Sequence, residues 1–274
     1  MNNALVRLIR RTPLHMIILV ITLIWLIPSV GLFISSFRPE RAIADSGWWT
    51  AELSNLNLDL YRQALNQTGM ADSFINSLFI TIPATIVPIM IAAFAAYAFA
   101  WLDFPGRNWL FVVVIGLLVV PLQMTFIPIL RVYNQTGLTG TFPGIWLAHA
   151  GYGLPFSIYL LRNFMGTLPR DLFESAHLDG ASSFDIFFRI VLPLSVPALA
   201  SLVIFQFMWV WNDLLVALIF LGGQPSVAPM TVTISNQVNS LGGNWQVLTA
   251  AAFISMILPL AVFFTWQLYF VRGI

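Results

Sequence analysis

The chain has 274 residues, of which 59% are hydrophobic and only 8% are charged, and its mean hydropathy is +0.86. No soluble domain of this length has an interior large enough for so much apolar surface, so the composition predicts an integral membrane protein. The net charge of +1 says nothing about nucleic acid, and none is expected as a partner. The absence of cysteine excludes disulfides, thiolate metal sites and a cysteine nucleophile.

Six apolar stretches are long enough for membrane-crossing helices, which need about 20 residues each. They cover residues 14–36, 73–100, 108–132, 143–165, 194–221 and 247–270. The fourth is the weakest candidate, because it contains His149, Gly151, Gly153 and Pro155. Its periodicity does not define where it begins or ends. The first is too long for a signal peptide and ends in no small-residue cleavage pattern, so we interpret it as a retained helix. The sequence therefore predicts an all-α membrane protein with six transmembrane helices.

Arginine placement orients these helices, because cytoplasmic loops carry an excess of basic residues. With the N-terminus inside, the cytoplasmic side receives eight arginines: Arg7, Arg10, Arg11, Arg107, Arg162, Arg170, Arg189 and Arg272. The outside receives four: Arg38, Arg41, Arg62 and Arg131. This predicts that both termini are cytoplasmic. Residues 1–72 then form an N-terminal arm, the first helix and an outer loop, and residues 73–270 form a five-helix core.

Two segments are expected outside the membrane. Residues 37–72 contain Trp48 and Trp49, a residue type enriched at membrane interfaces. Residues 222–246 are uncharged, rich in Ser, Thr, Asn and Gln, and bounded by Gly222-Gly223 and Gly242-Gly243. This second loop is either a flexible probe that touches another protein or a plain surface connector.

The largest cytoplasmic loop, at 169–193, has the signals of two short helices. Pro169 suits the start of the first helix and Gly180 suits its end, because glycine tolerates the left-handed conformation that closes a helix. A second helix is predicted from Ser182 to Ile190, with Asp185 as the partner in a capping box. On the residues alone, this loop is either a connector that shields the end of the bundle or a docking element.

A motif in the same loop resembles the conserved loop of ABC importer permeases. That family's pattern is Glu-Ala-Ala, three residues, Gly, nine residues and Ile-x-Leu-Pro; here Glu174-Ser175-Ala176, Gly180 and Ile190-Val191-Leu192-Pro193 match its spacing. Ser175 is the one departure. The resemblance implies the type I ABC importer fold, with the loop's first helix seated in a cleft of an ATP-binding subunit. The implied docking residues are Phe173, Glu174, Ser175, Ala176, His177, Leu178, Asp179 and Gly180.

Further segments are similar to the shorter permease of maltose-type carbohydrate importers. They are Ser36-Phe37-Arg38-Pro39, Asn76-Ser77, residues 95–100, Phe104-Pro105-Gly106-Arg107, Pro121 with Pro128, and Trp211-Asn212-Asp213. The resemblance implies a homologous second permease, two ATP-binding subunits that hold ATP and magnesium, an external sugar-binding protein, and a bacterial or archaeal cytoplasmic membrane. That family usually continues past an Arg-Gly-hydrophobic element into a short tail, whereas this sequence ends at Arg272-Gly273-Ile274.

Asp213 is the only acid within a predicted span, and an ionisable residue at membrane depth is a functional hypothesis by default. Sugars present hydroxyls to polar side chains and C–H faces to aromatic rings. The candidate solute path is therefore Gln206, Trp209, Asn212, Asp213, Tyr152 and Gln123. The alternative, which we favour for Asp213 and Asn212, is that they hydrogen-bond within the helix bundle.

The sequence thus predicts the permease subunit of an ATP-driven sugar importer that works by alternating access. It has no Gly-x4-Gly-Lys loop and no lysine, so ATP hydrolysis is expected in partner subunits and no cofactor in this chain. Three scattered histidines form no metal-ligand cluster, and no catalytic set marks an intramembrane enzyme. An ion-coupled secondary transporter would need intramembrane charge pairs and inverted repeats. A polyol or glycerol-phosphate-type cargo remains open, although an anionic cargo would favour arginines within the spans.

Overall fold

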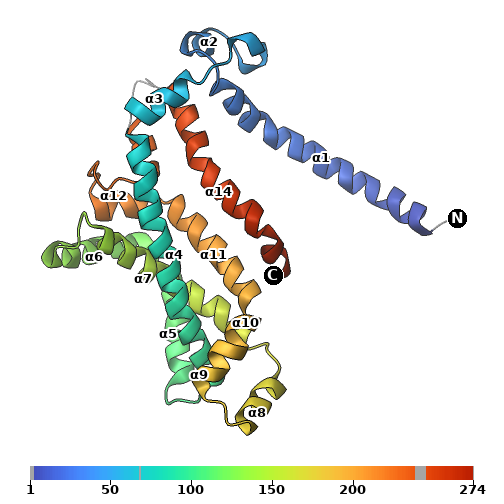
Figure 1. Cartoon of the computed structure of the whole chain (residues 1–274), viewed down its shortest axis with the longest axis vertical. Helices are drawn as coiled ribbons and strands as arrows, with labels where there is room; N and C mark the ends of the chain where they lie inside the picture. The colour runs from blue at the N-terminus through green and yellow to red at the C-terminus, as the bar shows by residue number, and fades with distance from the viewer. Residues whose placement is uncertain (1–2, 68, 238–244, 274) are drawn as a thin grey trace. The chain divides into compact units, whose positions relative to one another are not determined.

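The computed structural model describes residues 3–67, 69–237 and 245–273, and every regular element in these ranges is a helix (Figure 1). The chain divides into two compact units. The first comprises Met1–Met70 and Asn236–Ile254, and the second comprises Ala71–Ser235 and Ser255–Ile274. The long last helix, α14 (Trp245–Gly273), therefore contributes residues to both units.

The first unit contains the long helix α1 and a group of short helices that follows it. Their bounds are α1 Asn3–Ser35, α2 Glu40–Asp45, the 3-10 turns η1 Trp48–Thr50 and η2 Leu53–Asn55, and α3 Asp59–Gln67. The buried Arg38 guanidinium donates to the carbonyls of Ala42 (2.8 Å) and Ser46 (3.1 Å), which fixes the chain's turn after α1. The hydroxyls of Ser36 and Tyr61 lie 2.8 Å apart. The predicted outer loop 37–72 is thus a folded cap, with Trp48 packed on Gly31 of α1.

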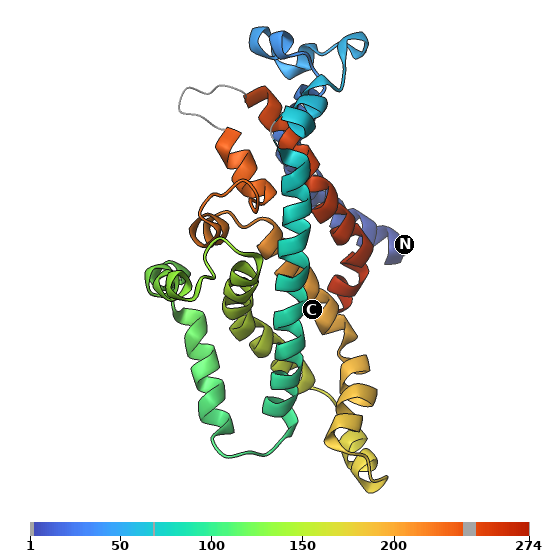
Figure 2. The same cartoon turned by 60° about the vertical axis from the view of Figure 1, so that its left-hand side comes forward.

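The second unit is a helical bundle around α4, α7 and α11 (Figures 1 and 2). Its elements are α4 Met70–Trp101, α5 Arg107–Val119, α6 Leu122–Thr136, α7 Phe142–Met165, α8 Arg170–Leu178, α9 Ser183–Ile186, the π-helical turn η3 Phe187–Val191, α10 Leu192–Leu194, α11 Val196–Trp211, α12 Leu215–Leu221 and α13 Met230–Gln237. Helix α7 packs against α5, α11 and α12. Ala92, Ala93 and Ala96 of α4 are buried, and such small residues let helices approach closely in a membrane.

Two of the six predicted spans are broken in the structure. Helices α5 and α6 meet at 101° beside Pro121, so the region predicted as a span over 108–132 is a bent pair of helices. The residue before a proline avoids the helical conformation, and Val120 is extended. The span predicted over 194–221 stops at Trp211 and resumes at Leu215, and a further bend of 71° separates α11 from the helical segment before it.

Length and composition identify three described helices that are long and apolar enough to cross a membrane. These are Thr12–Ser35, Met70–Trp101 and Gln246–Gln267; counting each bent pair as one span raises the number to five. Helix α7 covers the fourth predicted span but is not among them. The side chains of Arg7, Arg10, Arg11 and Arg272 fall outside the described residues. The total of six spans and the cytoplasmic termini therefore stay predictions.

The segment predicted as the loop 222–246 is partly helical and is tied to α4. Ser77 accepts a hydrogen bond from the backbone N–H of Met230 (2.8 Å), and Asn76 donates to the carbonyls of Ser226 and Ala228. Ser73 bonds Thr233 of α13. The described part of this segment is thus anchored rather than a free connector, whereas Gly242 and Gly243 lie outside the described residues.

Three of the bundle's interhelical hydrogen bonds follow from its prolines. A proline within a helix has no N–H, so the carbonyl four residues earlier loses its donor. Pro83 leaves the Phe79 carbonyl in this state, and the indole N–H of Trp146 on α7 donates to it at 2.7 Å. Pro88 leaves the Ala84 carbonyl, which accepts from the amide of Gln206 on α11 at 3.1 Å.

The same arrangement occurs at α14. Pro259 leaves the carbonyl of Ser255, and the indole N–H of Trp211 on α11 donates to it at 3.0 Å. Hydrocarbon offers no water to satisfy a freed carbonyl, so each bond removes a desolvation cost and joins two helices. The hydrogen bond from Gln206 to the Ala84 carbonyl also needs a glycine at position 153 of α7, because a Cβ there would lie 2.5 Å from the Gln206 amide nitrogen.

We predict that Trp146→Phe destabilises the protein by about 0.5–2 kcal/mol, the range for interhelical hydrogen bonds in membranes. In a Pro83→Ala background the same change should cost clearly less, because the introduced alanine supplies its own N–H to the Phe79 carbonyl. The measurement is a double-mutant cycle on denaturant unfolding in detergent. Trp109→Phe, at an indole that is 69% exposed, is the matched control. Equal costs of Trp146→Phe in the two backgrounds would contradict the proline explanation.

Candidate functional site

A cavity of about 280 Å³ lies between α7 and α11 and contains three of the six residues predicted for the solute path. Gln206, Trp209 and Tyr152 line it, together with Gly153, Phe156 and Phe205. The wall is thus aromatic, with one amide and one phenol as polar groups. Aromatic faces with a few neutral hydrogen-bonding groups suit an uncharged, hydroxyl-bearing solute.

The indole of Trp209 is supported from behind by His149 of α7. The two rings meet edge to face, with centroids 5.2 Å apart and planes at 90°. The imidazole is only 1% exposed, and its Nε2 lies 3.7 Å from Oδ2 of Asp213. His149 therefore does not line the cavity but supports a residue that does.

Asp213 marks the break between α11 and α12. Its carboxylate is 10% exposed and accepts from the backbone N–H groups of Val216 (3.2 Å) and Ala217 (2.9 Å), which have no partner within the first turn of α12. The Thr231 hydroxyl donates to the Asp213 carbonyl at 2.6 Å. The Asn212 amide donates to the Met208 carbonyl at 2.8 Å. Neither residue lines the cavity, so the structure favours the alternative interpretation, hydrogen bonding within the bundle.

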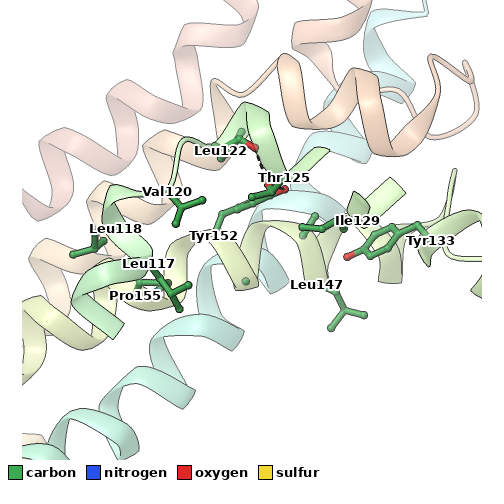
Figure 3. A pocket seen from close by; sticks show the side chains of 12 residues that line it. Leu117, Leu118, Val120, Leu122, Thr125, Ile129, Tyr133, Leu147, Tyr152 and Pro155 are labelled. Atoms are coloured by element: carbon green, nitrogen blue, oxygen red, sulfur yellow. Dashed lines mark hydrogen bonds between the residues drawn. The ribbon is translucent and has the colours of Figure 1, made fainter. Parts of the chain in front are cut away.

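A second cavity, of about 420 Å³, lies where α5 breaks into α6 and faces α7 (Figure 3). Tyr152 lines this cavity too, and its hydroxyl is 2.8 Å from that of Thr125. Tyr133 and Thr125 are its other hydroxyl-bearing residues. Gln123 is exposed and lines neither cavity, so the structure does not bring it together with the other predicted residues.

Several residues of the two cavities were missed by the sequence analysis. Thr125, Tyr133, Phe156 and Phe205 carry no local signal, because similar residues occur along every apolar helix. The run Gly151-Tyr152-Gly153 does carry one, since two glycines beside a tyrosine leave hollows on the helix surface. No group of three His, Cys, Asp or Glu side chains that could hold a metal ion occurs among the described residues.

The predicted two-helix loop is present, with α8 over Arg170–Leu178 and a corner at Gly180, whose φ is +78°. The loop lies at the same end of the second unit as the start of α5 (Figures 1 and 2). The eight residues of the predicted docking set divide into two groups. Phe173 and Ala176 are buried, whereas Glu174, Ser175, His177, Leu178, Asp179 and Gly180 are exposed.

Phe173 attaches α8 to the bundle. Its ring stacks on Trp101 of α4 with centroids 3.6 Å apart and planes at 15°, and the Trp101 indole N–H donates to the Met165 carbonyl at 2.9 Å. Burying a phenylalanine contributes roughly 1.5–3 kcal/mol where it is removed from water. Phe173 and Ala176 therefore hold the helix, and the opposite face, which includes Leu178 at 89% exposure, is left free of the bundle.

The second helix of the loop starts with the predicted capping box. Ser182 accepts from the backbone N–H of Asp185, while the hydroxyl and the backbone N–H of Ser182 both donate to the Asp185 carboxylate. The helix runs beyond its predicted end at Ile190, because it continues as the π-helical turn Phe187–Val191 and then as α10 to Leu194.

Comparison with known proteins identifies the class that this fold and these sites define. Residues 4–274 match the family model described as "Binding-protein-dependent transport system inner membrane component", and the chain belongs to that family. It is an ABC transporter permease subunit of the cytoplasmic membrane, a transport component rather than an enzyme. This confirms the resemblance drawn from the 169–193 motif.

Among curated relatives, the osmoprotective compounds uptake permease protein GgtD of Synechocystis sp. is 58% identical over 97% of this chain and 91% of its own length. The alpha-glucoside transport system permease protein AglG of Rhizobium meliloti is 41% identical over 97% of both chains. Among solved structures, a chain of a bacterial ABC transporter involved in alginate import covers 96% of both chains with a TM-score of 0.82 at 21% identity. That likeness shows the type I ABC importer fold.

We predict a pH dependence at the start of α9. The hydrogen bonds from the hydroxyl and then the backbone N–H of Ser182, followed by the charge of Arg189, hold the pKa of Asp185 below its usual value of 3.8. Because the folded-state pKa is the lower one, the ionised carboxylate stabilises the helix start above about pH 3.8. This contribution is lost as the pH falls through the folded-state value.

Hydrogen exchange at the amides of 183–186, corrected for intrinsic rates, measures the effect. Protection should fall between pH 5 and 2.5 in the wild type, whereas Asp185→Asn should be less protected at pH 5 and flat across that range. Parallel loss of protection in both proteins would show that the capping box is not the group that titrates.

Proposed function

We propose that this chain is one of two homologous permeases in an ATP-driven importer for neutral sugars or glycosides, with α-glucosides as the first class to test. The observation that carries the proposal is the lining of the two cavities on α7, which offers aromatic rings, hydroxyls and one amide but no carboxylate, guanidinium or imidazole. The functions named for the two relatives, uptake of osmoprotective compounds and of alpha-glucosides, support the same class of solute.

The cavity linings also bear on the alternatives. An anionic cargo such as a glycerol phosphate calls for arginine or lysine at the site, and the described lining residues include neither. A neutral polyol fits the same chemistry as a sugar and stays as the second candidate cargo. Ion-coupled secondary transport is disfavoured, because the chain belongs to a binding-protein-dependent family and the Asp213 carboxylate already caps α12.

The proposed contact with an ATP-binding subunit is the face of α8 that points away from the bundle. Glu174, Ser175, His177, Leu178 and Asp179 are exposed there, while Phe173 and Ala176 anchor the helix to α4 and its neighbours. A displacement of α8 would reach the bundle by two routes. One is the Phe173–Trp101 stack, and the other is the continuous segment of α9, the π-helical turn and α10 that leads to α11. We place this loop and both termini in the cytoplasm, in line with the arginine distribution.

The mechanism proposed is alternating access. ATP and magnesium in two partner ATPases drive closure of those subunits, α8 moves with them, and the bundle of residues 73–270 opens outward. An external binding protein then delivers the solute to the α7–α11 cavity. In this arrangement residues 1–72 are a separate arm, and the segment 222–246 lies on the external side.

The docking proposal is tested with Leu178→Asp in the complete transporter, purified through this chain together with its ATPase and second permease. We expect solute-stimulated ATP hydrolysis to fall at least about tenfold, because a charge replaces an apolar interface contact (about 1.4 kcal/mol per tenfold). Leu53→Asp, at a leucine that is 90% exposed in the first unit, is the matched control. Unchanged stimulation in Leu178→Asp, or purification of the chain without an ATPase, would contradict the proposal.

The solute proposal is tested by uptake of a panel of radiolabelled solutes into proteoliposomes. A neutral α-linked disaccharide should be imported in preference to glycerol phosphate. Trp209→Ala should lower that uptake roughly fivefold at unchanged affinity of the binding protein, because it removes an aromatic face from the cavity. Trp109→Ala changes an indole that lines neither cavity and serves as the control. Preferred import of the anion would reject the neutral-sugar assignment.

A further inference from the structure

The two cavities lie on neighbouring faces of one helix, and Tyr152 belongs to both. Successive residues of an α-helix point about 100° apart. Ala148, Gly151 and Pro155 of α7 line the larger cavity, and Gly153 and Phe156 line the smaller one. On a helical projection Tyr152 falls between these two groups. Its side chain therefore stands at the boundary between the cavities.

The glycines on either side of Tyr152 shape this boundary. A Cβ at Gly151 would have no atom within 4 Å, so that position opens onto empty space. A Cβ at Gly153 would meet the Gln206 amide, which occupies the space beside it. Because neither neighbouring residue has a side chain, the tyrosine ring projects from the surface of α7 as a ridge between the two cavities.

The ridge is held in place at its tip. The Thr125 hydroxyl donates its single proton to the Leu122 carbonyl at 2.7 Å, so in the 2.8 Å contact between the two hydroxyls Tyr152 is the donor (Figure 3). Thr125 lies in the first turn of α6, directly after the break at Pro121. The orientation of the ring is thus fixed by the segment that also walls the larger cavity.

In the larger cavity, one backbone carbonyl lacks the donor that an α-helix normally supplies four residues further on. Pro155 has no N–H for the Gly151 carbonyl, and both residues line this cavity. At Pro83, Pro88 and Pro259 a side chain from another helix donates to the carbonyl that the proline leaves. No described side-chain hydrogen bond does so at Gly151. A solute hydroxyl is a donor of the right kind for this carbonyl.

We infer that the two cavities are the halves of one saccharide groove, and that Tyr152 sets the length of saccharide that it admits. The inference rests on the proposed function. The smaller half, with the Trp209 face and the Gln206 amide, takes the first sugar ring. The larger half, with its hydroxyls and the Gly151 carbonyl, takes further residues only as far as the Tyr152 ring allows.

Tyr152→Ala tests this in proteoliposomes that contain the complete transporter and its binding protein. The quantity measured is the ratio of initial uptake rates of a neutral α-linked trisaccharide and the corresponding disaccharide, both saturating. We expect this ratio to rise roughly tenfold over wild type, the scale on which pocket shape discriminates between substrates. The binding protein's own preference cancels, because the same protein serves both transporters. Tyr159→Ala, two turns further along α7 at a tyrosine that lines neither cavity, is the control.

Gly151→Ala is the complementary variant and does not depend on Tyr152→Ala folding. It adds one methyl group in open space, so the fold is kept while the larger half narrows, and the ratio should fall. A ratio within twofold of wild type in both variants would overturn the role of Tyr152.

Two other outcomes are distinguishable from that one. If the wild-type transporter imports neither saccharide, the proposed function itself is wrong. If wild-type uptake is normal but Tyr152→Ala no longer copurifies with the second permease, the cavities are part of the subunit interface, and the groove assignment is overturned.

Discussion

The second unit depends on one constraint: a proline inside a membrane helix frees a carbonyl that hydrocarbon cannot satisfy. At three sites the donor comes from another helix, from Trp146 to α4, from Gln206 to α4 and from Trp211 to α14. Each proline thereby converts an intrahelical hydrogen bond into an interhelical one. The positions of α7 and α11 relative to the carbonyls of α4 and α14 to which they donate are fixed by hydrogen-bond lengths of 2.7–3.1 Å as well as by packing.

The cavity wall is built from the same elements. Gln206 binds the Ala84 carbonyl through its amide nitrogen and also faces the solute cavity, so a residue that joins two helices is part of the candidate site. Trp209 is three residues further along α11, and its ring contacts that of His149 edge to face. The His149 imidazole in turn lies 3.7 Å from the carboxylate of Asp213, at the break between α11 and α12. A change in how α7 and α11 meet would therefore alter the cavity directly. This links the proposed motion of α8 and α11 to the affinity of the cavity for solute.

What the sequence could predict was local. The helix after Pro169, the corner at Gly180 and the capping box at Ser182 depend on residues within a few positions of one another, and the structure has all three. The break at Pro121 and the restart of the helix after Asp213 were also marked locally, by a proline and by an aspartate, but the long apolar run around them concealed both signals. The partners of the freed carbonyls could not be predicted, since which donor reaches Phe79 or Ser255 depends on tertiary packing. Gln123 was selected for polarity alone and lies outside both cavities.

The three proline-dependent bonds all join uncharged groups, an indole or an amide with a backbone carbonyl. A membrane potential does work of about 2.3 kcal/mol on each elementary charge moved through 100 mV, but none on the net charge of such a bond, which is zero. Changes of pH near neutrality also leave indoles and amides as they are. The three bonds that hold the cavity wall in place therefore contain no group whose charge responds to the membrane potential or to pH near neutrality.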